Sequence, residues 1–228
     1  MKTRTLGKNG PKVSALSRLL SIIVVGCLVG DTMVAAQDTK PIPLPSPQTE
    51  IGKPLMQALK LRQSTKTFAP KPLPAQELSN LLWAANGINR TDSGKRTAPS
   101  AKNWQEVDVY VALPEALYLY DAKTHSLVPV VAKDLRGATG KQEFVKSAPL
   151  NLVYVVDSAR MKDASEEDKR LYGATDVGFI AQNVYLYCAS QGLAVVVRGG
   201  IVRPALSAAM RLRPEQRIIL AQTVGYPN

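Results

Sequence analysis

The sequence is poor in the side chains that usually carry catalysis or metals. Among its 228 residues it has one histidine and two cysteines. The histidine, His125, stands in a predicted turn, where we expect an exposed loop residue. This position argues against a Ser-His-Asp triad, a Cys-His pair and a histidine-based metal site. The sequence also lacks a GxGxxG motif and a Walker loop, so neither a Rossmann dinucleotide site nor a P-loop is indicated.

Residues 1–36 have the pattern of a secretory signal peptide. A basic start is followed by an apolar run at 19–29 and by small residues at 34–36, where a signal peptidase could cut. The run is shorter than the roughly 20 residues of a membrane span, which argues against an uncleaved anchor. A lipoprotein signal is the alternative, because Cys27 follows a small residue. We therefore expect a periplasmic or secreted protein, bound to a membrane only if Cys27 is lipidated.

Removal of the signal peptide would leave Cys188 as the one cysteine, so no disulfide could form within the chain. Cys188 lies in an apolar helical stretch, where a buried and inert thiol is expected. The formal net charge is +11, but the basic residues are scattered and no dense Lys/Arg run with interleaved aromatics occurs. The composition therefore favours a folded domain that does not bind nucleic acid.

Periodicity divides the rest of the chain into a linker and one domain. Four prolines in a short polar stretch predict an extended linker over 37–50, so we expect the folded domain to span 51–228. Within it, apolar spacing predicts helices over 54–61, 74–87, 143–146, 166–190 and 203–210, and strands over 106–113, 116–120, 126–131, 151–156, 193–197 and 217–224. This order indicates a mixed α/β or α+β domain.

Two polar clusters stand out in this domain. In RQSTKTF, Arg62, Ser64 and Lys66 alternate along an extended exit from the first helix and could project to one side. Two cations and a hydroxyl suit a phosphate group. The second cluster, PSAKNWQ at 99–105, gathers small polar groups around an aromatic residue, Trp104, which we expect to pack in an interface. A chain with few ionisable catalysts and two such clusters is typical of a protein whose cofactor supplies the reactivity.

Several stretches, in their order along the chain, carry a resemblance to a known family. They are LRQSTKTF (61–68), LLWAANGINR (81–90), RTAPSAKNWQEVDVYV (96–111), YLYD (118–121), and AQN (181–183) in a helix that ends at QGL (191–193). Over 51–228 the sequence resembles the FMN-dependent nitroreductase family and is most similar to its SagB-type dehydrogenase branch. The resemblance implies an α+β, nitroreductase-like fold, with a central, mostly antiparallel sheet flanked by helices, and a homodimer.

The resemblance also implies a set of cofactor-binding residues and no catalytic side chain, because flavin N5 carries the chemistry. The set comprises Arg62, Ser64 and Lys66 at the phosphate and ribityl chain, Pro99, Ser100, Asn103 and Gln105 reaching the flavin across the dimer interface, Gln142 at the pyrimidine side, and Gly199 and Gly200 near N5. Many members have further basic residues near the C-terminus, whereas this sequence ends at Asn228. Phosphate contact is therefore expected to depend on the first three residues.

The resemblance implies an FMN-dependent oxidoreductase that transfers hydride through flavin N5, and the pattern at 1–36 adds the expectation that it is secreted. Its substrate would be a small molecule or a modified peptide. NAD(P)H is the donor that many relatives use, but it is scarce outside the cytoplasm, so an exported enzyme would need another donor or would act as a dehydrogenase. One alternative is a non-catalytic flavin-binding or interaction protein that retains the fold. Another is a basic periplasmic binding domain without flavin.

Overall fold

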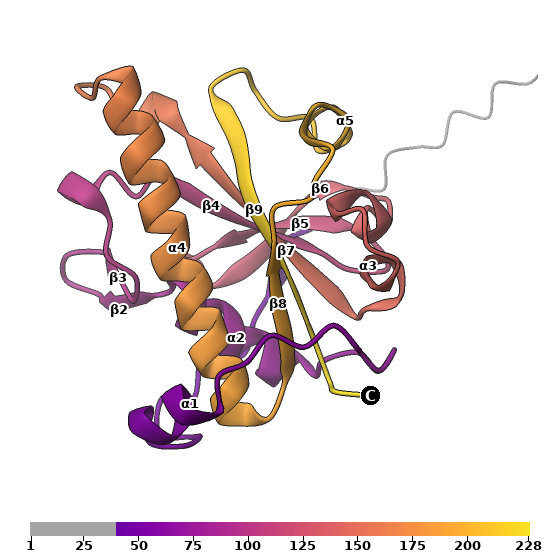
Figure 1. Cartoon of the computed structure of the whole chain (residues 1–228). Helices are drawn as coiled ribbons and strands as arrows, with labels where there is room; N and C mark the ends of the chain where they lie inside the picture. Colours follow the sequence, from indigo (N-terminus) through magenta and orange to yellow (C-terminus); the bar gives the residue numbers. More distant parts are fainter. Residues whose placement is uncertain (1–39) are drawn as a thin grey trace, which may run out of the picture. The chain divides into compact units, whose positions relative to one another are not determined.

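The computed structural model of the protein describes residues 40–228 (Figure 1). The predicted signal peptide at 1–36 and its Cys27 therefore lie outside the described residues. Within 40–228, none of the helices combines the length and the apolar character that crossing a bilayer requires.

A seven-stranded sheet forms the centre of the domain, and every neighbouring pair of its strands is antiparallel. In spatial order it contains β1 (Ile42–Pro43), β6 (Ser126–Val131), β5 (Leu117–Asp121), β4 (Val107–Ala112), β7 (Leu150–Asp157), β9 (Gln216–Gly225) and β8 (Ala194–Arg198). Every residue of β7 is buried, as its continuous apolar run predicted. Two short strands, β2 (Ile88–Arg90) and β3 (Lys95–Arg96), form a separate hairpin.

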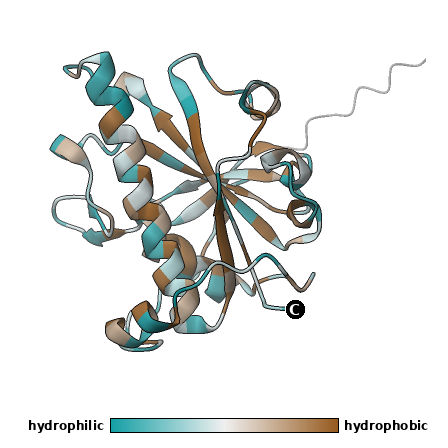
Figure 2. Cartoon of the chain, in the orientation of Figure 1, coloured by the Kyte–Doolittle hydropathy of each residue, from teal (hydrophilic) through white to brown (hydrophobic). Residues whose placement is uncertain are grey.

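Helices cover both faces of the sheet. They are α1 (Leu55–Leu61), α2 (Ala75–Asn86), α3 (Phe144–Ser147), α4 (Glu166–Gln191) and α5 (Arg203–Ala209), with short 3-10 turns η1 (Ala101–Asn103), η2 (Arg136–Thr139) and η3 (Ser158–Arg160). The apolar faces of α2 and α4 share one core cluster with the sheet, and α5 shares a second cluster on the other face. Figure 2 shows apolar residues along the strands between these layers. The predicted α+β fold, with an antiparallel sheet flanked by helices, is confirmed.

The long helix α4 has the end signals that its sequence predicts. At its start, the Ser165 side chain accepts a hydrogen bond from the backbone N–H of Asp168, and three acidic residues occupy the first turn, where the helix dipole favours negative charge. At its end, Gly192 has φ +75, a left-handed conformation that glycine adopts without strain. Cys188, near this end, is fully buried, and burial raises the pKa of its thiol. The predicted inert cysteine is thus confirmed as buried.

The segment before α1 differs from the predicted linker, because residues 42–48 are bound to the domain. β1 pairs with the start of β6, and the backbone N–H of Leu44 donates to the His125 carbonyl at 3.0 Å. Further along, the backbone N–H of Gln48 donates to Asn80 Oδ1 of α2 at 2.8 Å. The described fold therefore begins near Ile42, earlier than the predicted Ile51.

The prediction of an exposed His125 is wrong. The residue is half-buried, and its ring nitrogens bond to the Tyr120 hydroxyl at 2.9 Å and to the Pro45 carbonyl at 3.0 Å. The Ser79 hydroxyl also lies 2.7 Å from the imidazole. Burial lowers the pKa of His125, and the bond to Pro45 opposes this effect in part. The one histidine is therefore a structural link between the β5–β6 turn, α2 and the N-terminal segment.

Candidate cofactor site

The predicted phosphate-binding residues lie in an extended segment beside β8. The backbone N–H of Thr65 donates to the Val195 carbonyl at 2.9 Å, which aligns this segment with the strand. Next to it, the Ser64 hydroxyl shares a hydrogen bond of 2.8 Å with Tyr185 of α4, and the Arg62 guanidinium lies 5.4 Å from the centre of the same ring. Lys66 is exposed. No carboxylate within residues 40–228 forms a salt bridge with either cation, so both can meet an anion.

Tyr185 also connects this segment with the end of β8, where Gly199 and Gly200 follow. The Tyr185 hydroxyl accepts a hydrogen bond from the backbone N–H of Val197 at 2.9 Å, two residues before the exposed glycines. A Cβ atom on Gly200 would lie 3.3 Å from Gln142 Nε2. The other amide atom, Gln142 Oε1, is buried without a hydrogen-bond partner, which is a costly state for a polar atom. An N–H group of a bound ligand would satisfy it.

Sequence reasoning missed Arg198, which immediately precedes the two glycines. Its guanidinium is buried and donates to the Thr139 carbonyl at 2.8 Å, to Asn151 Oδ1 at 2.9 Å and to the Thr223 hydroxyl at 3.0 Å. Burial lowers the pKa of Arg198 to about 10, so the group stays charged at neutral pH. All of these acceptors are neutral. The sequence offered one signal that could have identified Arg198, which is an arginine at the end of an apolar strand, directly before two glycines.

The second predicted cluster forms a tight turn with unusual backbone angles. Lys102, Asn103 and Gln105 all have positive φ values, of 49, 56 and 49 degrees. The side chain of Gln105 is fully engaged, because it accepts from Arg96 Nε at 2.9 Å and donates to the Gly94 carbonyl and to Asn103 Oδ1, both at 3.1 Å. Such angles cost energy outside glycine and persist only where the surroundings enforce them. The positive φ values therefore indicate that the surrounding contacts hold this turn in one conformation.

The remaining members of the cluster lie on the outside of this turn. Pro99 and Asn103 are exposed, and Ser100 is half-buried. Trp104 packs edge-on against Tyr172 of α4, with ring centres 5.9 Å apart. This contact lies within the chain, so the predicted packing of Trp104 in an interface stays a prediction.

Two buried carboxyl groups hold the turn in place by accepting hydrogen bonds from it. Sequence reasoning did not connect these two groups. The Ser100 hydroxyl donates to Glu106 Oε2 at 3.1 Å, and the backbone N–H of Ala101 donates to Asp176 Oδ2 at 2.9 Å. Burial, with a smaller contribution from the neighbouring Asp176 carboxylate, raises the pKa of Glu106 to about 7. No sequence pattern links Glu106 with Asp176, because helix α4 brings the second residue to the first only in the folded chain.

The two predicted clusters lie apart in the described chain. Both contact α4, but one does so at Asp176 and the other at Tyr185. A helix rises 1.5 Å per residue, so these contacts lie about 13 Å apart along the axis. The structure therefore places Arg62, Ser64 and Lys66 on the segment beside β8, and Gln142 beside the Gly199–Gly200 pair that follows the same strand. It holds Pro99, Ser100, Asn103 and Gln105 as a separate group.

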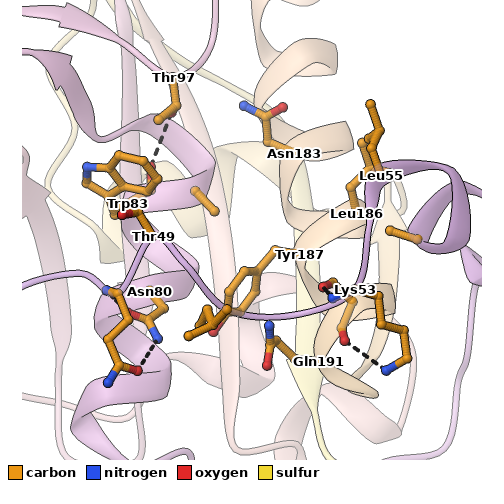
Figure 3. Close-up of a pocket in the computed structure, with 15 residues that line it drawn as sticks. Thr49, Lys53, Leu55, Asn80, Trp83, Thr97, Asn183, Leu186, Tyr187 and Gln191 are labelled. Atoms are coloured by element: carbon orange, nitrogen blue, oxygen red, sulfur yellow. Dashed lines mark hydrogen bonds between the residues drawn. The ribbon is translucent and has the colours of Figure 1, made fainter.

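A pocket of about 380 Å³ lies where α1, α2 and α4 meet (Figure 3). Its walls include Trp83, Tyr187 and Lys53, and Figure 3 shows the aromatic side chains on one side and Lys53 on the other. None of the predicted cofactor-binding residues lines it. Within 40–228 there is also no group of three or more histidine, cysteine or acidic side chains able to hold a metal ion.

Comparison with known proteins agrees with this geometry. The sequence profile of the nitroreductase family matches residues 59–226. An inferred nitroreductase of Methanocaldococcus jannaschii is 31% identical over 180 residues, covering 72% of this chain and 90% of the relative. The crystal structure of an inferred nitroreductase from Ralstonia eutropha is 46% identical, with a TM-score of 0.80, and the match covers 83% of this chain and 90% of that one.

A more distant structure shares the fold alone. The NADPH:FMN oxidoreductase of Vibrio harveyi, solved with NAD+, is 20% identical with a TM-score of 0.59, over 76% of this chain and 69% of that chain. The family profile and the close relative, together with the fold, settle the classification. The chain belongs to the nitroreductase family, a family of flavin-dependent oxidoreductases.

Proposed function

We propose that the protein is an FMN-dependent oxidoreductase that acts as a homodimer. The observation that carries this proposal is the group formed beside β8. There, two cations without carboxylate partners in the described chain and a hydroxyl lie on the segment beside β8. A buried amide oxygen without a partner belongs to Gln142, whose side chain lies beside the exposed glycines that follow this strand. This donor and acceptor set fits a molecule that has a phosphate at one end and a ring with N–H groups at the other.

Each side chain of this group has a binding role. Arg62 and Lys66 provide charge-assisted bonds to the phosphate, and Ser64 adds a neutral donor. Gln142 Oε1 accepts from the ring, and the absence of side chains at Gly199 and Gly200 lets the backbone approach the ring closely. When bound, FMN supplies hydride transfer at its N5 atom. Arg198 keeps a positive charge behind the glycines, which favours negative charge on the cofactor.

The proposed homodimer rests on exposed apolar surface. Ten large hydrophobic side chains of residues 40–228 are exposed, and eight of them lie either at 51–61 or on α4. They include Leu55 and Met56 on α1, and Leu171 and Phe179 on α4. A concentration of this kind marks a protein interface. A partner seated there would bring its own turn at 99–105 toward this protomer, which accounts for the separation of the two clusters.

We further propose that the protein is a SagB-type dehydrogenase that works in the periplasm or outside the cell. The pattern at 1–36 supports export, and it favours a donor other than NAD(P)H because nicotinamide cofactors are scarce there. The substrate would then be a small molecule or a modified peptide that itself gives up the hydride. Mass spectrometry of protein from cell fractions tests export, since cleavage before Gln37 and lipidation of Cys27 give different N-termini.

Titration with FMN tests the proposed cofactor site. We expect the purified protein to bind FMN, with the absorption spectrum of a bound flavin, and Lys66→Gln to weaken binding about tenfold to a hundredfold, because a charged hydrogen bond to the phosphate is lost. Lys60→Gln, which removes an exposed charge from α1, is the matched control and should bind like wild type. No flavin binding at excess FMN, or equal binding by both variants, would contradict the proposal.

Anaerobic reduction then separates an enzyme from a binding protein. A flavin that bleaches with NADPH, or with a candidate hydride donor, identifies an oxidoreductase. Bleaching by such a donor but not by NADPH supports the dehydrogenase branch. A tightly bound flavin that no donor reduces indicates the non-catalytic alternative.

A further inference from the structure

Glu106 and Asp176 form a buried acidic pair without a cation. Their exposed fractions are 0% and 3%, and neither carboxyl forms a salt bridge with a lysine, arginine or histidine of residues 40–228. Glu106 immediately precedes β4, and Asp176 lies on the buried face of α4. Two carboxylates so placed cannot both ionise without a large electrostatic penalty.

The pair holds one turn from two sides. Glu106 accepts from the Ser100 hydroxyl, and the same hydroxyl accepts from the backbone N–H of Gln105 at 2.8 Å. Asp176 accepts from the backbone N–H of Ala101 at 2.9 Å. These bonds fix both ends of the strained turn at 100–105, whose exposed residues include part of the second predicted cofactor cluster.

One oxygen of the pair has no partner. Glu106 Oε1 is buried and makes no hydrogen bond within the described residues. It borders a small cavity of about 10 Å³, which leaves space for one water molecule at most. An acid proton on this oxygen, donated toward Asp176, would satisfy it.

The other groups around the cavity do not neutralise the pair. Of the residues that line it, Arg96 is the one cation, from β3, and its guanidinium donates to Gln105 Oε1 and to the Asn86 carbonyl. α2 contributes the neutral Asn86, and α4 contributes Ile180 beside Asp176. Burial lowers the pKa of Arg96, as expected for a cation without a close counter-ion. The raised pKa of Glu106 agrees with a carboxyl that keeps its proton near neutral pH.

We propose that Glu106 and Asp176 share one proton, and that the protonated pair positions the 100–105 turn for binding the flavin of the neighbouring subunit. This inference rests on the proposed function, because the turn is expected to reach FMN across the dimer interface. Both carboxyls are positioning residues, because they are buried and act through their hydrogen bonds to the turn. Loss of the shared proton places two anions side by side, pushes the pair apart, and weakens the bonds to Ser100 and Ala101.

The first test is FMN affinity at pH 6 and pH 8. We expect FMN to bind when the pair holds its shared proton and not when both carboxyls are ionised. Because the pKa of Glu106 is about 7, the protonated fraction falls about tenfold from pH 6 to pH 8, and the Kd of wild-type protein should rise about tenfold. Glu106→Gln keeps the shape and the hydrogen bond of the protonated acid, so its Kd should change less than about twofold. Glu115→Gln, an exposed carboxylate on the β4–β5 turn, is the matched control and should follow wild type. Titration of the FMN phosphate itself affects all three proteins equally.

A second test needs no cofactor. A carboxyl whose pKa is raised by folding contributes stability that is fully present below its unfolded value of about 4.5 and is lost as pH rises through about 7. The ionisation of Glu106 should therefore raise the unfolding equilibrium constant of flavin-free wild type by up to about a hundredfold from pH 5 to pH 8. This increase should be absent in Glu106→Gln. Asp176→Ala, which removes the acceptor oxygen, should remove the hydrogen-exchange protection of the Ala101 amide at either pH.

The outcomes separate the two proposals. Equal pH profiles of FMN affinity in wild type and Glu106→Gln would overturn the inference and leave the flavin assignment intact. If the stability changes with pH through Glu106 but the protein binds no FMN at any pH, the proposed function is overturned. The shared proton between Glu106 and Asp176 would then be the one part of the inference that stands. Should Glu106→Gln fail to fold, Asp176→Asn takes its place, because it also removes one of the two negative charges.

Discussion

His125 makes the fold sensitive to acid. Because burial lowers its pKa in the folded protein, the unfolded chain takes up the proton more readily. The stability that the neutral ring contributes is therefore fully present above the unfolded pKa of about 6.5, and is lost as pH falls toward the folded value. We expect His125→Gln to be less stable than wild type at pH 7.5 and to lose less stability between pH 7.5 and pH 5.5. Urea unfolding at both pH values checks this, and parallel losses in both proteins would contradict it.

Some positions of the candidate site follow from a local sequence pattern, and others do not. Arg62, Ser64 and Lys66 follow one another at a spacing of two, so an extended segment gathers them without help from the fold. Glu106, Asp176 and Arg198 have no such local pattern. Their neighbours come from other strands and helices, and each would ordinarily be assigned to the surface because charged residues are seldom buried. His125 was misassigned for the same reason, since its partners are distant in sequence.

Long periodic elements were predicted well, and very short ones were missed. α4 and β7 carry many residues of one pattern, so their existence and extent follow from the sequence. β1, β2 and β3 have two or three residues each, which is too few for a pattern. β1 exists because the prolines that predicted a linker also leave the chain extended, and an open sheet edge lies next to it.

The C-terminus of α4 offers a test of a single backbone angle. No atom lies within 4 Å of the position that a Cβ on Gly192 would take, so substitution there changes conformational strain and not packing. We expect Gly192→Ala to lower the free energy of unfolding by about 1 kcal/mol, because alanine tolerates φ +75 poorly. Gly192→Asn should cost less than half as much, since asparagine adopts this conformation more readily. Chemical denaturation of both variants measures the difference, and equal losses would rule out strain as the cause.

The assembled molecule should depend on the apolar surface of α4. Phe179 is 44% exposed, and a buried charge at this position would oppose the packing of a partner. We expect wild-type protein to sediment as a dimer and Phe179→Glu as a monomer at micromolar concentration. The monomer should also bind FMN less tightly, because it lacks the turn that the partner contributes.

The matched control for this experiment lies on the other face of the sheet. Val202, just before α5, is 51% exposed, and Val202→Glu should remain dimeric with unchanged FMN affinity. Analytical ultracentrifugation distinguishes the two variants. A dimeric Phe179→Glu, or a monomeric Val202→Glu, would place the interface elsewhere.

Without the N-terminal part of the described chain, β6 and β8 would be the outermost strands of the sheet. The two-residue strand β1 pairs with β6, and the backbone N–H of Thr65 donates to Val195 of β8. Beyond the two residues paired with β1, β6 contains Pro129, which has no N–H to offer. Uncovered strand edges recruit further strands and lead to aggregation. The N-terminal segments therefore prevent the chain from polymerising through its own sheet. A protein shortened to begin after Lys66 would expose both edges, and we expect it to form insoluble fibres or inclusion bodies.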